Sequence, residues 1–232
     1  KWLYVIVGLV FIAGILGTAH HYYWVGVPQY WLPIGGFFSA LEPLALVGMA
    51  MYAYYAMRRS GLAHPNVLAV HWTIGSAVFT LFGAGLLGLA HTWPSVNKWT
   101  HGTLITAMHG HAAFYGAYAM IVMAMISYAL PAMTRRPEGG TTFGWWSFWL
   151  QIAGMFGMTL SFATAGIGQV YLERIMGLGY LDAQLKIQVH FLMLIATASV
   201  FAIGVILFII DFFRYAPRFE VSREADPLVP PA

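Results

Sequence analysis

The 232-residue sequence is 60% hydrophobic and 16% aromatic but only 8% charged, a composition that a water-soluble domain could not keep in solution. It contains no cysteine, which excludes disulfides, thiolate zinc sites and iron–sulfur clusters and leaves histidine, carboxylate and methionine as metal ligands. The net charge of +3 reflects basic residues in the connectors and does not indicate nucleic-acid binding. These properties predict an all-α integral membrane protein whose surroundings are the lipid bilayer.

Six apolar runs are long enough to cross a bilayer, because each reaches the roughly 20 residues that a span requires. We therefore expect a six-helix transmembrane part over residues 1–216 and an exposed, charged and proline-rich tail over residues 217–232. The first run follows no initiator methionine and no polar leader, so we expect the chain to be part of a larger one. The expected spans are Trp2–Trp24, Ile34–Met57, Asn66–Ala90, Trp99–Leu130, Phe143–Tyr171 and Gln184–Phe213.

The basic residues predict how the spans are oriented. With six spans, the N-terminus, the second and fourth connectors and the tail share one side of the membrane. Because basic residues favour the cytoplasm, we expect the side that holds most of them to be cytoplasmic and the tail to lie there. Eight of them, Lys1, Arg58, Arg59, Arg135, Arg136, Arg214, Arg218 and Arg223, are on that side, and three, Lys98, Arg174 and Lys186, are on the other.

Two histidines, His109 and His111, occupy one turn of the fourth expected span. On an α-helix two residues turn through about 200°, so these side chains leave the helix on nearly opposite faces and cannot share one metal ion. Each could instead be the axial ligand of a separate haem, with the helix passing between the two cofactors. The alternative is two polar side chains that bond to neighbouring helices. The cost of placing two histidines of one turn in lipid makes the functional role as well supported as this alternative, and leaves both open at this point.

Two further polar features belong to the outer half of the membrane. His20 and His21 are consecutive near the outer end of the first span, and their long side chains could converge on one ion if the helix end is irregular. Such a pair is also common at interfaces and wetted helix ends, and a metal would need at least one more ligand. Counting residues at 1.5 Å each places His20 and His21 about 5 to 6 Å below the outer boundary and His109 about 15 Å below it.

Glu42 is the one acidic residue in the first four spans, about 12 Å below the outer boundary by the same count. A carboxylate in a bilayer costs several kcal/mol unless it is protonated, paired or ligated, so a group that handles protons beside a metal is one interpretation. The other is a neutral acid bonded to a backbone carbonyl that Pro43 leaves free. On either interpretation Glu42, His20 and His109 could meet.

The remaining histidines are weaker candidates. We expect His64 and His71, on the cytoplasmic side, to be structural, and His91 and His101 to lie at the outer boundary, where solvated helix ends are favoured over contacts with haem propionates. His190 lies at a depth compatible with a haem contact. Glycines along the third and fifth spans predict close helix packing. They are Gly83, Gly85, Gly88, Gly154, Gly157, Gly166 and Gly168.

Three stretches together carry a family resemblance, namely residues 17–24 (GTAHHYYW), 38–43 (FSALEP) and 108–111 (MHGH), the last continuing from Ala112 to Tyr118. They closely resemble the catalytic, haem b-containing subunit of bacterial nitric oxide reductases, within the haem-copper oxidase superfamily. The similarity runs over the whole chain, which looks like the C-terminal half of a twelve-helix subunit.

The resemblance implies a role for each residue of the motifs. His109 matches the axial ligand of the high-spin haem b, and His111 matches one axial ligand of the low-spin haem b. His20 and His21 match two of three histidine ligands of a non-haem iron, and Glu42 matches a glutamate beside that iron. The third histidine, a carboxylate ligand and the second ligand of the low-spin haem would belong to the N-terminal half of the subunit, which is therefore an expected partner.

The resemblance also implies an activity and a location. Two NO molecules would be reduced to nitrous oxide and water by electrons that reach the high-spin haem from the low-spin one, with Glu42 as a relay for protons from the periplasm. We expect the bacterial inner membrane, an active site in its periplasmic half, and two haem b groups, one non-haem iron and possible calcium as cofactors. A membrane-anchored cytochrome c subunit is favoured over quinol as the electron donor.

Three other functions compete with this interpretation. A cbb-type oxygen reductase shares the histidine motifs but holds copper and carries a tyrosine one or two turns before the histidine pair, where this chain has Ile12 to Leu16 without tyrosine. A non-catalytic di-haem cytochrome would use His109 and His111 but leave His20, His21 and Glu42 without a role. A transporter or channel would use Glu42 and contain no haem.

Overall fold

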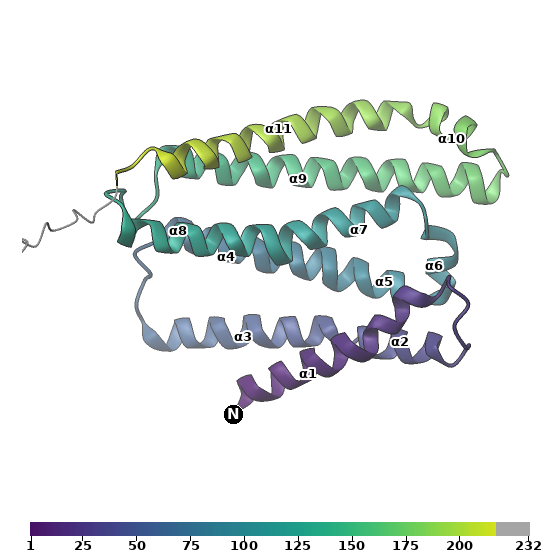
Figure 1. The fold of residues 1–232 in the computed structure, drawn as a ribbon, viewed down its shortest axis with the longest axis horizontal. Helices are drawn as coiled ribbons and strands as arrows, with labels where there is room; N and C mark the ends of the chain where they lie inside the picture. The colour runs from purple at the N-terminus through teal and green to yellow at the C-terminus, as the bar shows by residue number, and fades with distance from the viewer. Residues whose placement is uncertain (217–232) are drawn as a thin grey trace, which may run out of the picture.

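The computed structural model describes residues 1–216, which fold as a bundle of long apolar helices (Figure 1). Six helical segments within these residues are long and apolar enough to cross a membrane, which confirms the predicted all-α membrane architecture. The tail predicted over residues 217–232 lies outside the described residues. The six spans are Trp2–Tyr22, Trp31–Ser60, Val67–Thr92, Leu104–Met133, Thr142–Ile175 and Gln188–Phe213.

Five of the spans contain a change of helix type or a break. The first ends in a 3₁₀ segment, the second is broken at Ala40, the third and fourth pass through π segments, and the fifth ends in one. The bounds are α1 Trp2–Gly17, η1 (3₁₀) Thr18–Tyr22, α2 Trp31–Ser39, α3 Glu42–Ser60, α4 Val67–Phe79, η2 (π) Thr80–Leu87, α5 Gly88–Thr92, α6 Pro94–Thr100, α7 Leu104–Phe114, η3 (π) Tyr115–Met120, α8 Ile121–Met133, α9 Thr142–Gln169, η4 (π) Val170–Ile175, α10 Tyr180–Lys186 and α11 Gln188–Phe213.

The predicted start of the fourth span at Trp99 was wrong. Trp99 belongs to the separate short helix α6, and the chain turns at Gly102, whose φ of 70° is in the left-handed region that suits glycine. The side chain of Thr103 then caps α7 by accepting a hydrogen bond from the amide of Ile105. His109 is therefore five residues into its span, or about 8 Å along the axis, rather than the expected 15 Å.

The last span also starts later than predicted, at Gln188 rather than Gln184, because Tyr180–Lys186 forms the separate helix α10. The second span starts earlier than predicted, at Trp31, so Glu42 is about 16 Å along it rather than 12 Å. Glu42 begins α3, and Pro43 occupies the first turn of α3, where the missing amide proton would have no partner within the helix.

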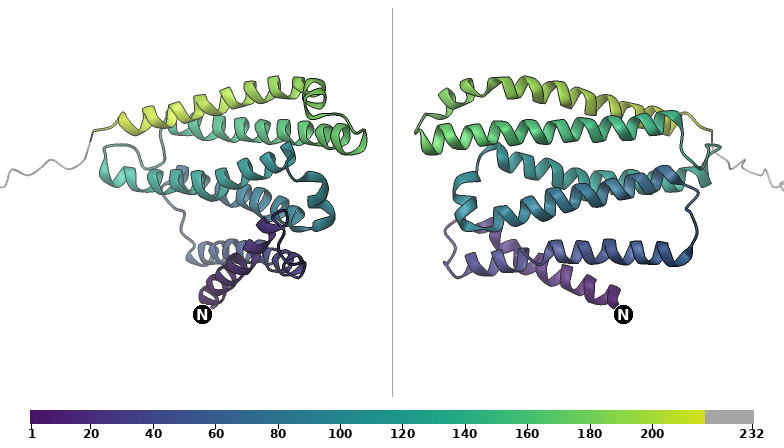
Figure 2. Two further views of the ribbon diagram at one scale, coloured as in Figure 1. Left: turned by 45° about the vertical axis from the view of Figure 1, so that its right-hand side comes forward. Right: turned by 180° about the vertical axis from the view of Figure 1, so that it is seen from behind.

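The helices lie in three successive layers. The pair α9 and α11 lies on one side, α4–α5 and α7–α8 lie in the middle, and α1 to α3 form the other edge (Figure 1; Figure 2 shows the same order from behind). The core between the middle helices and α9 contains Trp72, Tyr115 and Phe148, with edge-to-face contacts between the rings of Trp72 and Phe148.

Glycines set the close approach of neighbouring helices, as predicted for the fifth span. A Cβ atom at Gly154 would lie 2.5 Å from the backbone nitrogen of Phe201 on α11, and one at Gly166 would lie 2.5 Å from the backbone nitrogen of Ile105 on α7. Real Cβ atoms do not approach backbone that closely, so only glycine permits these contacts. The small residues thereby hold α9 against both of its neighbours.

The two ends of the bundle differ in chemistry. The C-terminal ends of α3, α8 and α11 all lie at the left of Figure 1; Arg58 is in the last turn of α3, and Arg135 and Arg214 follow α8 and α11. At this end Arg136 and Asp211 form a buried ion pair with an N–O distance of 3.1 Å, and Thr141 donates a hydrogen bond to the same carboxylate. The histidines of the predicted site belong to the opposite half of the bundle.

Candidate haem and metal site

The irregular helix end that a shared metal would require is present at His20 and His21. Both lie in the 3₁₀ segment η1, and their ring centroids are 4.1 Å apart. The Nδ1 atom of His20 is 2.7 Å from the carbonyl oxygen of Gly17 and 2.6 Å from the hydroxyl oxygen of Ser39 on α2. Both contacts are made by Nδ1, so they hold the His20 ring at one nitrogen and leave Nε2 for another partner.

His109 is held by the neighbouring span rather than by its own helix. Its Nδ1 atom is 2.7 Å from the carbonyl oxygen of Gly83, which lies in the π segment η2. A π segment interrupts the regular pairing of carbonyls with amides four residues later, and such segments are common at functional sites. A Cβ atom at Gly83 would lie 2.5 Å from the carbonyl carbon of Ala112, so glycine also allows η2 and α7 to come this close.

His91 is not the solvated helix end that the sequence led us to expect. It is buried, with 8% of its surface exposed, and its ring stacks on the ring of His109 at a centroid distance of 5.1 Å and an angle of 22°. The reason is that the third span continues through α5 to Thr92, which carries His91 past the expected boundary and onto α7.

The hydrogen bonds of these histidines define which ring nitrogen is free. Nδ1 of His20, His91, His109 and His111 faces the carbonyl oxygen of Gly17, Leu87, Gly83 and Ala107, respectively, at 2.7 to 2.8 Å. A carbonyl only accepts, so Nδ1 carries the proton and Nε2 presents a lone pair in each neutral ring. Histidines that bind metals are typically oriented in this way, with the second nitrogen bonded to a carbonyl.

His111 points away from this cluster, as the helical geometry predicted. His109 contacts η2 and α5, whereas the ring of His111 lies 4.7 Å from that of Phe162 on α9. His111 is exposed in the part of the chain that the structure describes. The two histidines of α7 therefore lie against different neighbouring helices. This arrangement fits two separate flat cofactors rather than one shared ion.

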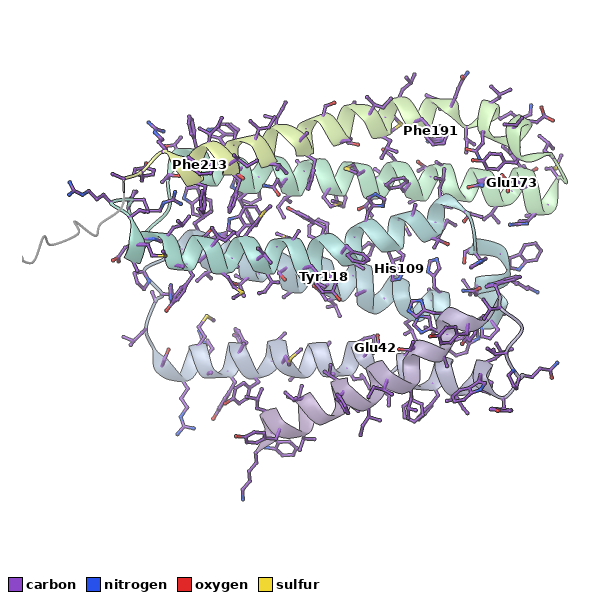
Figure 3. All side chains as sticks on the ribbon, viewed as in Figure 1. Glu42, His109, Tyr118, Glu173, Phe191 and Phe213 are labelled. Atoms are coloured by element: carbon purple, nitrogen blue, oxygen red, sulfur yellow. The ribbon has the colours of Figure 1, made fainter. Side chains whose placement is uncertain are left out.

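Glu42 lies beside the histidine pair, at the junction of α2 and α3 (Figure 3 labels Glu42 and His109). A Cβ atom at Gly17 would lie 3.0 Å from the Oε1 atom of Glu42. Gly17 is also the residue whose carbonyl binds His20, so Glu42 is placed one helical turn from the histidine pair. The half-buried carboxyl thus adjoins the predicted metal ligands.

Tyr23, directly after η1, contacts both α2 and α5. Its hydroxyl oxygen is 2.8 Å from the carbonyl oxygen of Leu32 on α2 and 2.9 Å from that of Thr92 on α5. Burial raises the pKa of the Tyr23 phenol above its ordinary value, so the hydroxyl keeps its proton and remains a donor. The short helices that carry His20 and His91 are thereby linked at the outer end of the bundle.

The other histidines have local partners. His101 stacks on Trp24 at 4.8 Å, and Trp24 donates a hydrogen bond to Asn97, which joins the first span to α6. Nδ1 of His190 lies 3.0 Å from the hydroxyl of Thr164 and links α11 to α9. His71 lies against Trp145 and bonds to the carbonyl of Val67, and His64 accepts a hydrogen bond from the amide of Asn66. These contacts agree with the structural roles expected for His64 and His71.

The chain brings together part of a metal site. Within residues 1–216, no group of three histidine, aspartate or glutamate side chains lies close enough to hold one metal ion. His20 and His21 nevertheless place two imidazoles side by side, which are nitrogen ligands that suit iron or another transition metal, and Glu42 lies one helical turn from such a site. Ligands from another segment would be needed to complete it.

Sequence reasoning missed three contributors to this arrangement. Ser39 and the carbonyl of Gly83 orient His20 and His109, and His91 packs on His109. Ser39 stood in the motif that contains Glu42, and Gly83 in the glycine run assigned to packing, so both positions drew attention for another reason. Nothing in the sequence indicated the stacking of His91, because it depends on how α5 meets α7.

Comparisons with known proteins agree with this geometry. The sequence profile of the family described as cytochrome c and quinol oxidase polypeptide I matches residues 1–209. A nitric oxide reductase subunit of Stutzerimonas stutzeri is 40% identical over 220 residues, which are 91% of this chain and 46% of that protein. The chain thus spans about half the length of this curated relative.

Proposed function

Because the chain belongs to the cytochrome c and quinol oxidase polypeptide I family, we propose that it is the C-terminal half of the catalytic subunit of a nitric oxide reductase. The reaction is the reduction of two NO by two electrons and two protons to one nitrous oxide and one water. The observation that carries the proposal is the pair His20 and His21, with Glu42 one helical turn away and His109 of α7 in the same half of the bundle (Figure 3).

The residues divide between two haem groups and one iron. His109 holds a high-spin haem b and His111 a low-spin haem b through their Nε2 atoms, while His20 and His21 bind a non-haem iron. When bound, these groups supply electrons and Lewis acidity to the two NO molecules. Gly17, Gly83 and Ala107 keep the proton on Nδ1 of the histidines, so that the lone pair of each Nε2 is available without rearrangement.

Glu42 is the proton-handling group of the site. Its carboxyl begins α3 next to Gly17, within one turn of His20, and it is half-buried. In that position it holds a proton close to the space where oxygen is released as water. The protons come from the periplasmic side, because the histidine cluster belongs to the half of the bundle opposite the basic, cytoplasmic end.

The remaining components complete the assembly. The N-terminal half of the subunit supplies the third histidine and the carboxylate of the non-haem iron and the second axial ligand of the low-spin haem. A membrane-anchored cytochrome c is the electron donor, and the protein resides in the bacterial inner membrane. Calcium is a further possible cofactor, to be sought in the same metal analysis.

Metal analysis of the whole subunit tests the proposal. We expect two haem b groups and one non-haem iron per subunit, and NO consumption with nitrous oxide as product. Replacing His20 and His21 by alanine removes the non-haem iron and NO turnover and leaves both haems in place. The matched control is His64→Ala, whose imidazole bonds only to the turn before α4. Retention of non-haem iron in the double variant would refute the assignment of the pair.

An oxygen reductase is the second candidate, because the family description includes oxidases. Such an enzyme would hold copper in place of the non-haem iron and would consume oxygen. The residues Ile12 to Leu16 before the histidine pair contain no tyrosine, which favours the NO enzyme. Copper in place of non-haem iron would decide for the oxidase.

A further inference from the structure

His91 is the buried histidine that has no part in the proposed reaction. Its Nδ1 donates a hydrogen bond to the carbonyl oxygen of Leu87, one turn earlier on the same span, at 2.8 Å. Its Nε2 atom is buried and has no hydrogen-bond partner among the described residues. The face of the ring lies on the ring of His109.

The third span surrounds His109 on three sides. The carbonyl oxygen of Gly83 binds Nδ1, the ring of His91 covers one face, and Gly88 lies at the edge, where a Cβ atom would come within 3.3 Å of Cε1. These three residues lie within nine positions of one another and pass from η2 into α5. A single rigid segment therefore forms a slot that fits the His109 ring.

Resting on the proposed function, we propose that His91 is a positioning residue that fixes the rotation of the His109 imidazole about the axis through its Nε2 atom. A hydrogen bond at Nδ1 restrains one atom of the ring but leaves the ring plane free to tilt around that bond. A second ring stacked on the face removes this freedom, because tilting would drive the two rings into each other.

The bond to Leu87 explains why an imidazole suits this position. A side chain that covers His109 must itself be immobile, and the Nδ1 bond to its own helix holds His91 in one rotamer. A phenylalanine would keep the covering face and lose the anchor. An alanine would lose both.

The test uses the full-length subunit with both haems bound. Resonance Raman spectroscopy of the reduced protein measures the iron–imidazole stretching band of the high-spin haem, which responds to the orientation of its histidine. We expect His91→Ala to shift and broaden this band while haem content stays at the unsubstituted level, and His91→Phe to restore its position. Gly88→Ala perturbs the same slot from the edge and is expected to shift the band as well.

His71→Ala is the matched control, because His71 also donates from Nδ1 to a carbonyl one turn earlier but lies against Trp145 at the other end of the span. An unchanged band in His91→Ala would overturn the proposal, as would a band in His91→Phe that is displaced as far as in His91→Ala. If His91→Ala fails to fold, His91→Leu replaces it in both comparisons, because leucine fills the space without a flat face to stack on His109. An unsubstituted subunit without a histidine-ligated high-spin haem would instead contradict the proposed function itself.

Discussion

The Nδ1 atom of His109 lies 2.7 Å from the carbonyl oxygen of Gly83, so a histidine on one span is oriented by the backbone of another. The contact depends on two local features of the third span, a π segment around Gly83 and the lack of a side chain there. Gly83 therefore both allows the two spans to pack closely and orients the His109 ring.

Gly83→Ala is expected to destabilise the protein. The new Cβ atom would lie 2.5 Å from the backbone of Ala112, and overpacking of this kind costs about 1–3 kcal/mol. Separating the two spans would also weaken the bond that orients His109, so we expect loss of the high-spin haem. Thermal unfolding and haem content measure the two effects. Gly14→Ala, where the added atom meets nothing within 4 Å, is the control and should leave both values unchanged or slightly raise stability.

Glu42→Gln is expected to slow NO turnover by about 10²-fold or more, the usual contribution of a proton-transfer group, with both haems and the non-haem iron retained. Glutamine keeps the size of the side chain and removes its proton. Steady-state NO consumption across a range of pH measures the effect. The control is Glu173→Gln in η4, where the carboxylate accepts a hydrogen bond from Gln169. Unchanged turnover at all pH values would show that Glu42 carries no proton.

Asp211→Asn should destabilise the opposite end of the bundle. The change leaves the buried Arg136 guanidinium without its charge partner, and breaking a buried pair in this way costs about 3–5 kcal/mol. We expect a lower unfolding temperature and unaltered haem spectra, because the pair is remote from the histidine cluster. Glu138→Gln in the adjacent exposed loop is the control. A stability like that of the unsubstituted protein would mean that the pair does not hold this end together.

Tyr23 contributes stability that is lost at high pH. Because burial raises the pKa of its phenol in the folded protein, the stabilisation is fully present below the unfolded pKa of about 10 and is lost as the pH rises through the higher folded value. Tyr23→Phe removes the hydroxyl that faces Leu32 and Thr92, at a cost of about 1 kcal/mol. The free energy of unfolding, measured between pH 8 and pH 11, should therefore fall less steeply with pH for the variant than for the unsubstituted protein.

Most of the fold could be predicted from hydropathy, because a membrane span must be apolar over a length set by the bilayer. The errors were at boundaries that depend on local backbone conformation. Apolar residues such as Trp99 extended the predicted fourth span into α6, since hydropathy does not register the turn at Gly102. The resulting depth of His109 was too large for the same reason.

The candidate ligands could be proposed from the sequence, but the groups that orient their side chains could not. His20, His21, Glu42, His109 and His111 were recognisable because polar residues in lipid are costly and because together they match one family. The partners that orient them are backbone carbonyls of Gly17 and Gly83, which every residue carries and no motif identifies. The position of His91 in the sequence predicted a place at the outer membrane boundary. Its contact with His109 depends on how α5 packs on α7, which the sequence does not indicate.

His109 and His111 are proposed to hold two different haems on the two sides of α7, and optical spectroscopy of single variants tests this most directly. We expect His109→Ala to lose the high-spin haem and keep the low-spin spectrum, and His111→Ala to lose the low-spin spectrum and keep the high-spin haem, each with one haem per subunit. Two haems in both variants, or the same spectral loss in both, would contradict the claim.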